Sequence, residues 1–547
     1  MSNPKSDSLF VIDRRDFDPK NYWYIHGKYY NLTNYMEKHP GGKFILEKTK
    51  GQGDLSALYE SYHAFSNIDN IDKYLKTFEV KFHAPVTNTD NETTLQNQRQ
   101  QHQYKIDNYN IIYVPQNNIY DAYMNIANSF EDQEEQDQET ESQEPESQET
   151  HETESQETQE QEQPQTIVEN QQQNETQFDF TNYRILTQQA KQLFPTRESI
   201  KANHEWHTLV IAALFTFFYS FYQGLFSSPQ SLLQKFAFLL PFLSTQIKVA
   251  LLRTFFITLA SASWLGLGFN VMHDGSHYAI TTDPNINHYA TKTWNALNGW
   301  NAVIWFYHHV QNHHTYTGME KKDPDLYHFR PLMVKSMNDY SVHPFLKKIQ
   351  PYTFPLITIL LPGQNLGQSI SYFISSFRRK LWNFKLPDAH HTPEFYDTYD
   401  ISFFFLSLLA YENILLLGNG YWLFLYFIQI NFFYMFNIIF DHDLFETNVQ
   451  NKYHGKDWVI QQICHSGNFC NGNRFWTKWF GAINHQIEHH LFPSMSNSHY
   501  PTIAPLVKKY CETNDIPYVH QPTFKEAIQS FAKTLYWHSI TQEQKRD

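Results

Sequence analysis

Residues 421–440 read YWLFLYFIQINFFYMFNIIF, a stretch without a single charged side chain. A helix that crosses a bilayer needs about 20 predominantly apolar residues. The stretch therefore predicts a transmembrane helix. Gly418-Asn419-Gly420 separates it from a second apolar run at 401–417, and such a short glycine-containing turn predicts a tight hairpin of two helices.

A second pair of apolar runs lies upstream, so the chain holds two potential hairpins. The four runs that approach spanning length are 208–226, 249–271, 401–417 and 421–440. Basic residues flank the hairpins at their open ends: Lys191, Arg197, Lys201, Arg378, Arg379 and Lys380. The positive-inside rule then predicts that the long polar segments face the cytosol. Two further apolar stretches, 236–247 and 354–376, are interrupted by prolines, and we expect them to lie along the membrane surface.

The polar segments beside the hairpins carry three histidine clusters. They are His273-Asp274-Gly275-Ser276-His277, His309-Val310-Gln311-Asn312-His313-His314 and Gln486-Ile487-Glu488-His489-His490. On a helix, residues four apart share one face, so each cluster presents several imidazoles in one direction. One such cluster is commonly a solvated surface, but three on the same predicted membrane face indicate a metal site.

The number of imidazoles bears on the choice of metal. Imidazole suits zinc, copper, iron and nickel. A zinc site needs only about four ligands, whereas these clusters offer about twice that number. The set fits two metals of octahedral type side by side, and two irons are the natural choice for oxygen activation.

These clusters resemble the histidine boxes of the membrane fatty acid desaturase family, over residues from about 190 to 535. Asp323-Pro324-Asp325-Leu326 after the second cluster and Leu491-Phe492-Pro493 after the third add to the resemblance. The resemblance implies two non-heme iron ions on the cytosolic side and one more histidine after the last span, for which His442 is the candidate. The implied metal ligands are His273, His277, His309, His313, His314, His442, Gln486, His489 and His490.

Gln486 stands where many members of the family have histidine. Glutamine there is typical of the front-end subfamily, which inserts a double bond between an existing one and the carboxyl end. Its carbonyl oxygen can bind iron or hold a water ligand. Asp274, Asp323, Asp325 and Glu488 are candidates to hydrogen-bond the far nitrogens of the ligand imidazoles and fix their tautomers. For Asp323 and Asp325, plain surface charge is an equal interpretation. The nearby His308, His454, His465, His485 and His499 lack the box pattern, and we expect them to be solvated or locally hydrogen-bonded.

A different motif lies near the N-terminus. His39-Pro40-Gly41-Gly42 followed by His63 resembles the cytochrome b5 fold, in which two imidazoles bind heme b from opposite faces. The glycines permit a tight turn beside a porphyrin. The resemblance implies a small α+β heme domain over residues 18–84, with His39 and His63 as the axial ligands.

The segment between the two modules is strongly acidic. Residues 131–177 hold about 17 acidic side chains and no Lys or Arg, whereas the whole chain has a formal charge of −14. We predict that residues 85–180 are a disordered Glu/Gln-rich linker and that 181–547 form the membrane domain. The negative net charge of the chain therefore comes from the linker and indicates no particular partner. We expect no nucleic-acid partner. The three cysteines fit neither a zinc site nor a disulfide framework, which indicates a reducing compartment.

Taken together, the residues predict an α-helical membrane protein with about four transmembrane helices, a cytosolic histidine-rich helical cap and a heme domain of the cytochrome b5 type. The family resemblance implies O2-dependent desaturation of a polyunsaturated fatty acyl lipid or acyl-CoA, at Δ6 or Δ5. It also implies NADH-cytochrome b5 reductase as electron source and the endoplasmic reticulum as location. The alternatives are a Δ8 sphingolipid desaturase, a lipid hydroxylase with the same heme domain, and a non-catalytic heme adaptor.

Overall fold

The structure is a computed structural model. It describes residues 10–12, 17–82 and 178–540, apart from short gaps within 328–341, 361–362, 383, 389–393 and 450–456. Residues 85–177 of the predicted linker and His454 lie outside the described residues. Residues 178–180 are described, and there the prediction of disorder was wrong, because Phe178 and Phe180 are buried in the core.

The N-terminal module is a small α+β unit with two two-stranded sheets. β2 (Trp23–Ile25) pairs antiparallel with β3 (Lys28–Tyr30), and β1 (Phe10–Ile12) pairs parallel with β4 (Val80–Phe82). Its helical elements are η2 (Pro19–Asn21), η3 (Thr33–Lys38), α1 (Lys43–Thr49), α2 (Ser56–His63), α3 (Ile68–Leu75) and η4 (Lys76–Phe78).

The core of this module is built around Trp23, which is 1% exposed and donates a hydrogen bond to the Leu46 carbonyl at 2.9 Å. Gly42 precedes α1 with φ of 90°, in a region that residues with a Cβ rarely adopt. The second glycine of the His-Pro-Gly-Gly motif therefore turns the chain from His39 into a helix.

Among its described residues, the C-terminal module contains four helices that are long and apolar enough to cross a membrane: His204–Phe226, Thr245–Ser276, Thr398–Leu416 and Gly420–His442. Each overlaps one of the four apolar runs, so the prediction of four spans is confirmed. The first comprises α8 (His204–Phe221) and the π-helical η6 (Tyr222–Phe226). The second comprises α10 (Thr245–Leu267), the π-helical η8 (Gly268–His273) and α11 (Asp274–Ser276).

The second hairpin has the predicted tight turn, because α17 (Thr398–Leu416) ends four residues before α18 (Gly420–His442) begins. Gly418 takes a φ of 73° in this turn. A capping box formed by Asp397 and Asp400 starts α17.

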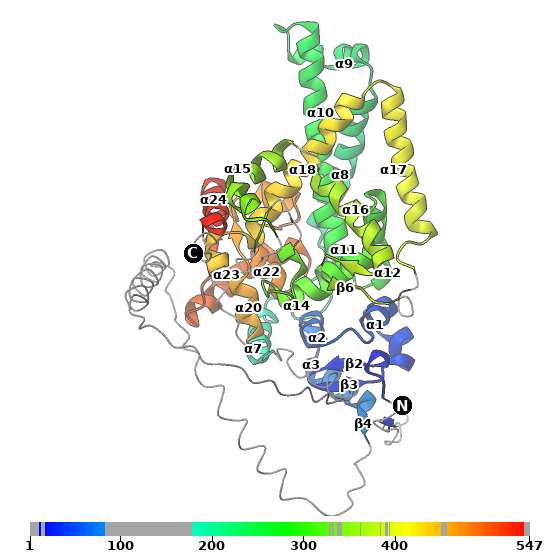
Figure 1. The fold of residues 1–547 in the computed structure, drawn as a ribbon, viewed down its shortest axis with the longest axis vertical. Coiled ribbons are helices and arrows are strands. Elements are labelled where there is room, and N and C mark those ends of the chain that lie inside the picture. The colour runs from blue at the N-terminus through cyan, green and yellow to red at the C-terminus, as the bar shows by residue number, and fades with distance from the viewer. Residues whose placement is uncertain are drawn as a thin grey trace, which may run out of the picture. The chain divides into compact units, whose positions relative to one another are not determined.

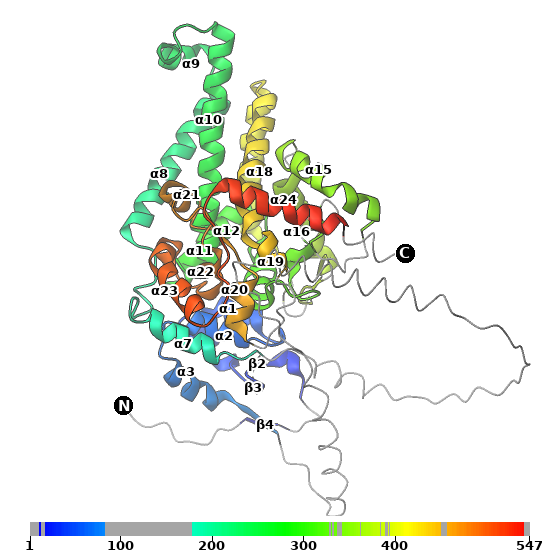
Figure 2. The same ribbon diagram turned by 90° about the vertical axis from the view of Figure 1, so that its left-hand side faces the viewer.

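α10 packs against both α8 and α18, and the three helices lie side by side in Figures 1 and 2. Large apolar side chains on their outer surfaces are exposed, among them Phe215 at 75% on α8 and Leu416 at 77% on α17. Exposed apolar surface of this kind is typical of contact with lipid.

The remaining elements surround the base of these helices or follow them in the chain. They are α7 (Thr181–Ala190), α9 (Pro229–Phe236), η7 (Ala237–Leu239), α12 (Pro284–Leu297), α13 (Ala302–Trp305), the π-helical η9 (Phe306–His313), α14 (His314–Tyr316), η10 (Pro324–Tyr327), α15 (Pro344–Leu360), α16 (Gly363–Arg378), β5 (Lys380–Leu381), β6 (Phe384–Lys385), α19 (Phe445–Val449), α20 (Trp458–Cys464), β7 (Asn468–Phe469), α21 (Arg474–Trp479), α22 (Gln486–Leu491), η12 (Asn497–His499), α23 (Tyr500–Thr513), β8 (His520–Gln521) and α24 (Phe524–Ile540). The 236–247 and 354–376 stretches lie outside the four spans except where 245–247 begins α10, and their place along a membrane surface stays a prediction.

Candidate metal centre and heme pocket

Elements from four parts of the chain bring the predicted ligands together. η8 and the residues that follow it carry the first histidine cluster, η9 and α14 carry the second, α22 carries the third, and His442 ends α18. Ring nitrogens within 4.8 Å of one another form three imidazole groups: His273, His277, His309 and His489; His313, His442 and His490; and His314, His489 and His490.

The spacing inside these groups suits ligands around a metal. The Nε2 atom of His309 lies 3.1 Å from Nε2 of His273 and 3.3 Å from Nε2 of His314. The Nε2 atom of His442 lies 3.2 Å from Nε2 of His313 and 3.1 Å from Nε2 of His490. With metal–nitrogen bonds of about 2.0–2.1 Å, neighbouring ligands at right angles are about 3 Å apart.

Several buried ligand atoms face this space without a protein partner. Among the described residues, Nε2 of His277, Nε2 of His489 and Oε1 of Gln486 have no hydrogen-bond partner. Buried polar atoms are normally satisfied, so unpaired lone pairs at one place require an explanation. A pair of cations held by these atoms supplies one, and the donor set therefore fits the metal ions that the sequence implies.

Burial keeps most of these imidazoles neutral, as metal ligands must be. Loss of solvation, followed by repulsion from neighbouring imidazoles, holds the pKa well below its ordinary value for His277, His309, His314, His489 and His490. His313 differs, because Asp325 and Asp323 outweigh the effect of burial and raise its pKa.

The far nitrogen of His313 has the carboxylate partner that the sequence predicted. Nδ1 of His313 lies 3.0 Å from Oδ1 of Asp323, and both side chains are buried. Asp325 lies 3.6 Å from the same nitrogen, but its closer partner is Nε2 of His308 at 2.6 Å.

The predicted roles of Asp274 and Glu488 were wrong. Asp274 accepts hydrogen bonds from Ser496 and from the backbone of Asn497, both at 3.1 Å. Glu488 accepts from Asn468 at 2.9 Å and from Tyr518 at 2.8 Å. Both carboxylates therefore connect the boxes to neighbouring segments of the chain.

Neutral groups orient two other ligands. Nδ1 of His490 lies 2.9 Å from Oε1 of Gln462 and 3.1 Å from the Thr317 hydroxyl. Nδ1 of His489 lies 3.1 Å from the Tyr500 hydroxyl. The sequence reasoning missed these partners because a single neutral polar residue outside the boxes carries no motif signal.

The two candidate ligands His442 and His277 have partners of other kinds. Nδ1 of His442 donates to the His465 carbonyl at 2.7 Å, and Nδ1 of His277 lies 2.8 Å from the hydroxyl of Tyr62 in the N-terminal module. Each ring is thereby turned so that its Nε2 faces the centre.

Gln486 lies at the edge of the second imidazole group. Its Nε2 is 3.0 Å from Nε2 of His442. Rotating the amide by half a turn would place its oxygen where this nitrogen lies. Of the histidines outside the box pattern, His465 and His485 hydrogen-bond to nearby residues of the chain, as expected. The expectation was wrong for His308 and His499, which hydrogen-bond to Tyr372 and to the Lys201 carbonyl in distant segments.

The first box begins and the second box lies mostly on a π-helical turn, which the sequence reasoning did not predict. η8 ends at His273 and η9 spans Phe306–His313. A π-turn pairs residues five apart, so its wider repeat lets His309, His313 and His314 point inward together.

A small cavity of about 70 Å³ adjoins the centre. One part of its wall is apolar and includes Trp300, Trp305 and Ile438, while Asp325, Lys335 and Asp441 also line it. Apolar walls beside a polar reaction centre suit a hydrocarbon chain.

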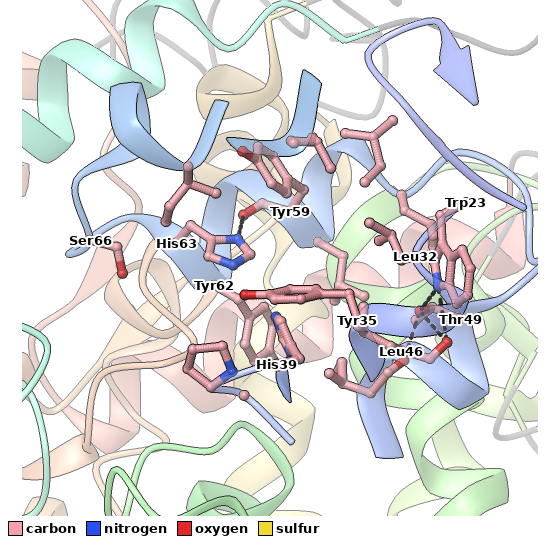
Figure 3. Close-up of a pocket in the computed structure, with 18 of the residues that line it drawn as sticks. Trp23, Leu32, Tyr35, His39, Leu46, Thr49, Tyr59, Tyr62, His63 and Ser66 are labelled. Atoms are coloured by element: carbon pink, nitrogen blue, oxygen red, sulfur yellow. Dashed lines mark hydrogen bonds between the residues drawn. The ribbon is translucent and has the colours of Figure 1, made fainter. Parts of the chain in front are cut away.

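The N-terminal module has a larger cavity, of about 410 Å³, and Figure 3 shows that His39 and His63 both line it. The two rings are 6.2 Å apart between centroids. That separation leaves room for a metal bonded to both rings at about 2 Å. Nδ1 of His63 lies 2.8 Å from the Tyr59 carbonyl, and Nδ1 of His39 lies 3.3 Å from the Gly42 carbonyl, so both Nε2 atoms remain for a metal. Burial lowers the pKa of His39 to about 4, which keeps its lone pair available. The pocket therefore fits heme.

Comparison with known proteins identifies both modules. The fatty acid desaturase family model matches residues 248–522, half of the chain, and the model for the cytochrome b5-like heme/steroid binding domain matches residues 12–81. The chain belongs to the fatty acid desaturase family and carries a cytochrome b5-like domain. The family implies a di-iron centre, and the second domain implies heme.

Among the similar curated proteins are three desaturases. The acyl-lipid (8-3)-desaturase of Mortierella alpina is 26% identical over 49% of this chain and 61% of its own length. The Delta(5) fatty acid desaturase A of Dictyostelium discoideum is 27% identical over 49% of this chain and 59% of its own length. The sn-1 linoleoyl-lipid 6-desaturase of Synechocystis is 26% identical over 48% of this chain and 74% of its own length. The match thus spans about three fifths of the first two relatives.

Proposed function

We propose that the chain is an O2-dependent front-end desaturase that acts on a polyunsaturated fatty acyl chain at Δ6 or Δ5. The observation that carries this proposal is the convergence of eight imidazoles, seven of them buried, from four parts of the chain. The relatives named for desaturation at position 5 or 6, together with Gln486 in the third box, support the front-end class.

We assign the metal ligands by their distances. One ion would be held by His273, His277, His309 and His489, and the other by His313, His442 and His490. His314 lies within reach of both groups, and Gln486 lies beside the second. When bound, two irons supply oxygen activation.

The overall reaction fixes what the chain must bring together. Removal of two hydrogens from adjacent carbons and reduction of one O2 to two waters consume two further electrons and two protons. We propose that NADH-cytochrome b5 reductase supplies the electrons through the heme domain, whose fusion raises the local concentration of the donor.

The protein residues position the acyl chain. Trp300 and Trp305 are almost fully buried in the wall of the cavity next to His309, and the Trp305 ring stacks on the His309 ring at 4.4 Å between centroids. Chemically equivalent methylenes are distinguished only by where the cavity holds them, so such rigid aromatic walls would determine which carbon pair lies at the centre.

The proposed location is the membrane of the endoplasmic reticulum, with the boxes and the heme domain on the cytosolic side. The basic residues at the open ends of the two hairpins support this orientation. The charge-free turn at Gly418–Gly420 would then face the lumen.

The test is expression in yeast supplied with C18 and C20 polyunsaturated acids, followed by mass-spectrometric location of new double bonds in the acyl and sphingoid fractions. A new Δ6 or Δ5 bond is expected. The variant His313→Gln should lose it, whereas His207→Gln, at an exposed position on α8, should retain it. A Δ8 sphingoid product, a hydroxylated product, or activity that survives His313→Gln would each refute the proposal.

A further inference from the structure

Tyr62 contacts both cofactor sites. It lies on α2 directly before His63, and its ring lines the heme cavity with His39 and His63. Its hydroxyl lies 2.8 Å from Nδ1 of His277, and the two rings are nearly parallel, with 28° between their planes. Figure 3 shows Tyr62 among the residues around this pocket.

The contact continues into the metal centre. With Nδ1 of His277 occupied by Tyr62, Nε2 of the same ring faces the group formed by His273, His309 and His489. A single hydrogen bond therefore separates a side chain of the heme cavity from an assigned metal ligand.

We propose that Tyr62 is the positioning residue that couples the heme to the di-iron centre, by joining the heme cavity to His277. The inference rests on the proposed function. One electron passes at a time: heme iron changes from ferrous to ferric, and one iron of the centre changes from ferric to ferrous. No covalent bond forms or breaks, and the phenol keeps its proton. Two such transfers supply the two electrons that each double bond requires.

Contacts on both sides of Tyr62 hold α2 against the membrane domain. Glu60, two residues earlier on α2, is 2% exposed and receives two hydrogen bonds from Nε and Nη2 of Arg184 on α7. Lys191 donates to the Ser66 carbonyl at 2.7 Å, just beyond the end of α2. The Arg184–Glu60 pair is bidentate, the geometry that fixes orientation as well as distance.

A second set of contacts comes from the histidine-box segment itself. The Tyr307 hydroxyl donates to the Lys48 carbonyl at 2.9 Å, and Nε2 of Gln311 donates to the Gln52 carbonyl at 3.2 Å. Both donors lie on η9, which also carries His309 and His313. The element that presents metal ligands thus also holds the heme domain in place.

The experiment measures heme oxidation directly. The heme of the full chain is reduced without oxygen and then mixed with O2 and acyl substrate in a stopped-flow spectrometer, and the heme absorbance is followed, with rates normalised to bound iron. Tyr62→Phe removes the hydrogen bond and should slow heme oxidation roughly tenfold, as for other partners of metal ligands. Tyr62→Leu also removes the ring and should slow it further.

The control is Tyr22→Phe. Tyr22 lies directly before β2 in the same domain and is not among the described residues that line the heme cavity. This variant should oxidise its heme at the wild-type rate. Equal rates in wild type, Tyr62→Phe and Tyr62→Leu would overturn the inference, as would equal slowing in Tyr22→Phe.

A second measurement separates coupling from damage to the centre. When dithionite with a mediator reduces both cofactors before O2 is added, Tyr62→Phe should form as much double bond per iron as wild type in a single turnover. A parallel loss of this product would overturn the inference. Failure of wild type to form any double bond would instead refute the proposed function, so the two failures are distinguishable.

Discussion

Asp323 offers a quantitative test of the metal assignment, because its carboxylate supports a ligand without belonging to any box. Its Oδ1 lies 3.0 Å from Nδ1 of His313 and 2.9 Å from the backbone nitrogen of Asp325, and its Oδ2 lies 2.7 Å from the backbone nitrogen of Gly318. Replacing Asp323 with Ala removes both acceptor oxygens, and with them three hydrogen bonds, at a position that is 2% exposed.

Two effects follow, and their sizes can be worked out separately. Loss of a partner behind a ligand histidine costs about 10- to 100-fold in metal affinity, which corresponds to roughly 1.4–2.8 kcal/mol. Each backbone N–H left buried and unpaired costs about 1–3 kcal/mol of folding free energy. Asp323→Ala should therefore lose iron readily and unfold at a lower denaturant concentration. Asp323→Asn keeps one acceptor oxygen and should fall between Ala and wild type.

The heme provides an internal standard for the assay. Iron bound per heme is measured by elemental analysis and heme absorbance after incubation with a graded series of chelator concentrations. Glu512→Ala, which removes an exposed carboxylate on α23, is the control and should retain iron like wild type. If Asp323→Ala retains iron as well as Glu512→Ala does at every chelator concentration, His313 does not hold a metal in the way that we assign.

Three further predictions concern the heme, the third box and the contact between the modules. His39→Ala removes an axial ligand and should abolish the low-spin heme absorbance while iron bound by the boxes is retained; unchanged heme spectra would contradict the pocket assignment. Gln486→Ala should lose non-heme iron at a lower chelator concentration than wild type if the amide takes part in the second group, and an identical titration would exclude it. Burial alone would raise the pKa of Glu60, but the hydrogen bonds from His26 and Arg184 bring it below 4.5. A carboxyl group whose pKa is depressed in the folded state stabilises the fold at pH values above its unfolded pKa, and this stabilisation is lost as the pH falls through the folded pKa. Acid unfolding below about pH 4.5 should therefore be less steep in Glu60→Gln than in wild type.

The spans could be predicted because their signal is local and continuous. A helix in lipid must be apolar over its whole length, and the hairpin turn needs a residue such as Gly418 that tolerates positive φ. The π-turns have no comparable signal in the amino-acid sequence. Whether residues pair four or five apart depends on packing around the histidines, and the composition of 306–313 does not report it.

The ligands and their supports differ in the same way. Motif spacing predicted the candidate ligands, because each box repeats imidazoles along one helical face. Their supports come from distant segments, such as Gln462, Tyr500 and Tyr62, where a single polar residue carries no periodic signal. Asp323 was predictable because it follows the second box closely, whereas Asp274 and Glu488 lie inside boxes yet bind neighbouring loops.

The position of the heme ligand next to Tyr62 has a further consequence for how the two modules work together. His63 and Tyr62 are successive residues of one helix, so any movement that separates Tyr62 from His277 also moves a heme ligand away from the metal centre. The contacts that hold α2 in place combine polar and apolar interactions. The Arg184–Glu60 ion pair and the Lys191–Ser66 hydrogen bond lie beside apolar packing, in which the Phe65 ring contacts the Phe492 ring. Relative motion of two modules is expected unless their interface is large and apolar, so this apolar packing favours one defined docked position. Under the proposed function, that position keeps His63 beside the metal centre while Tyr62 bridges the two sites.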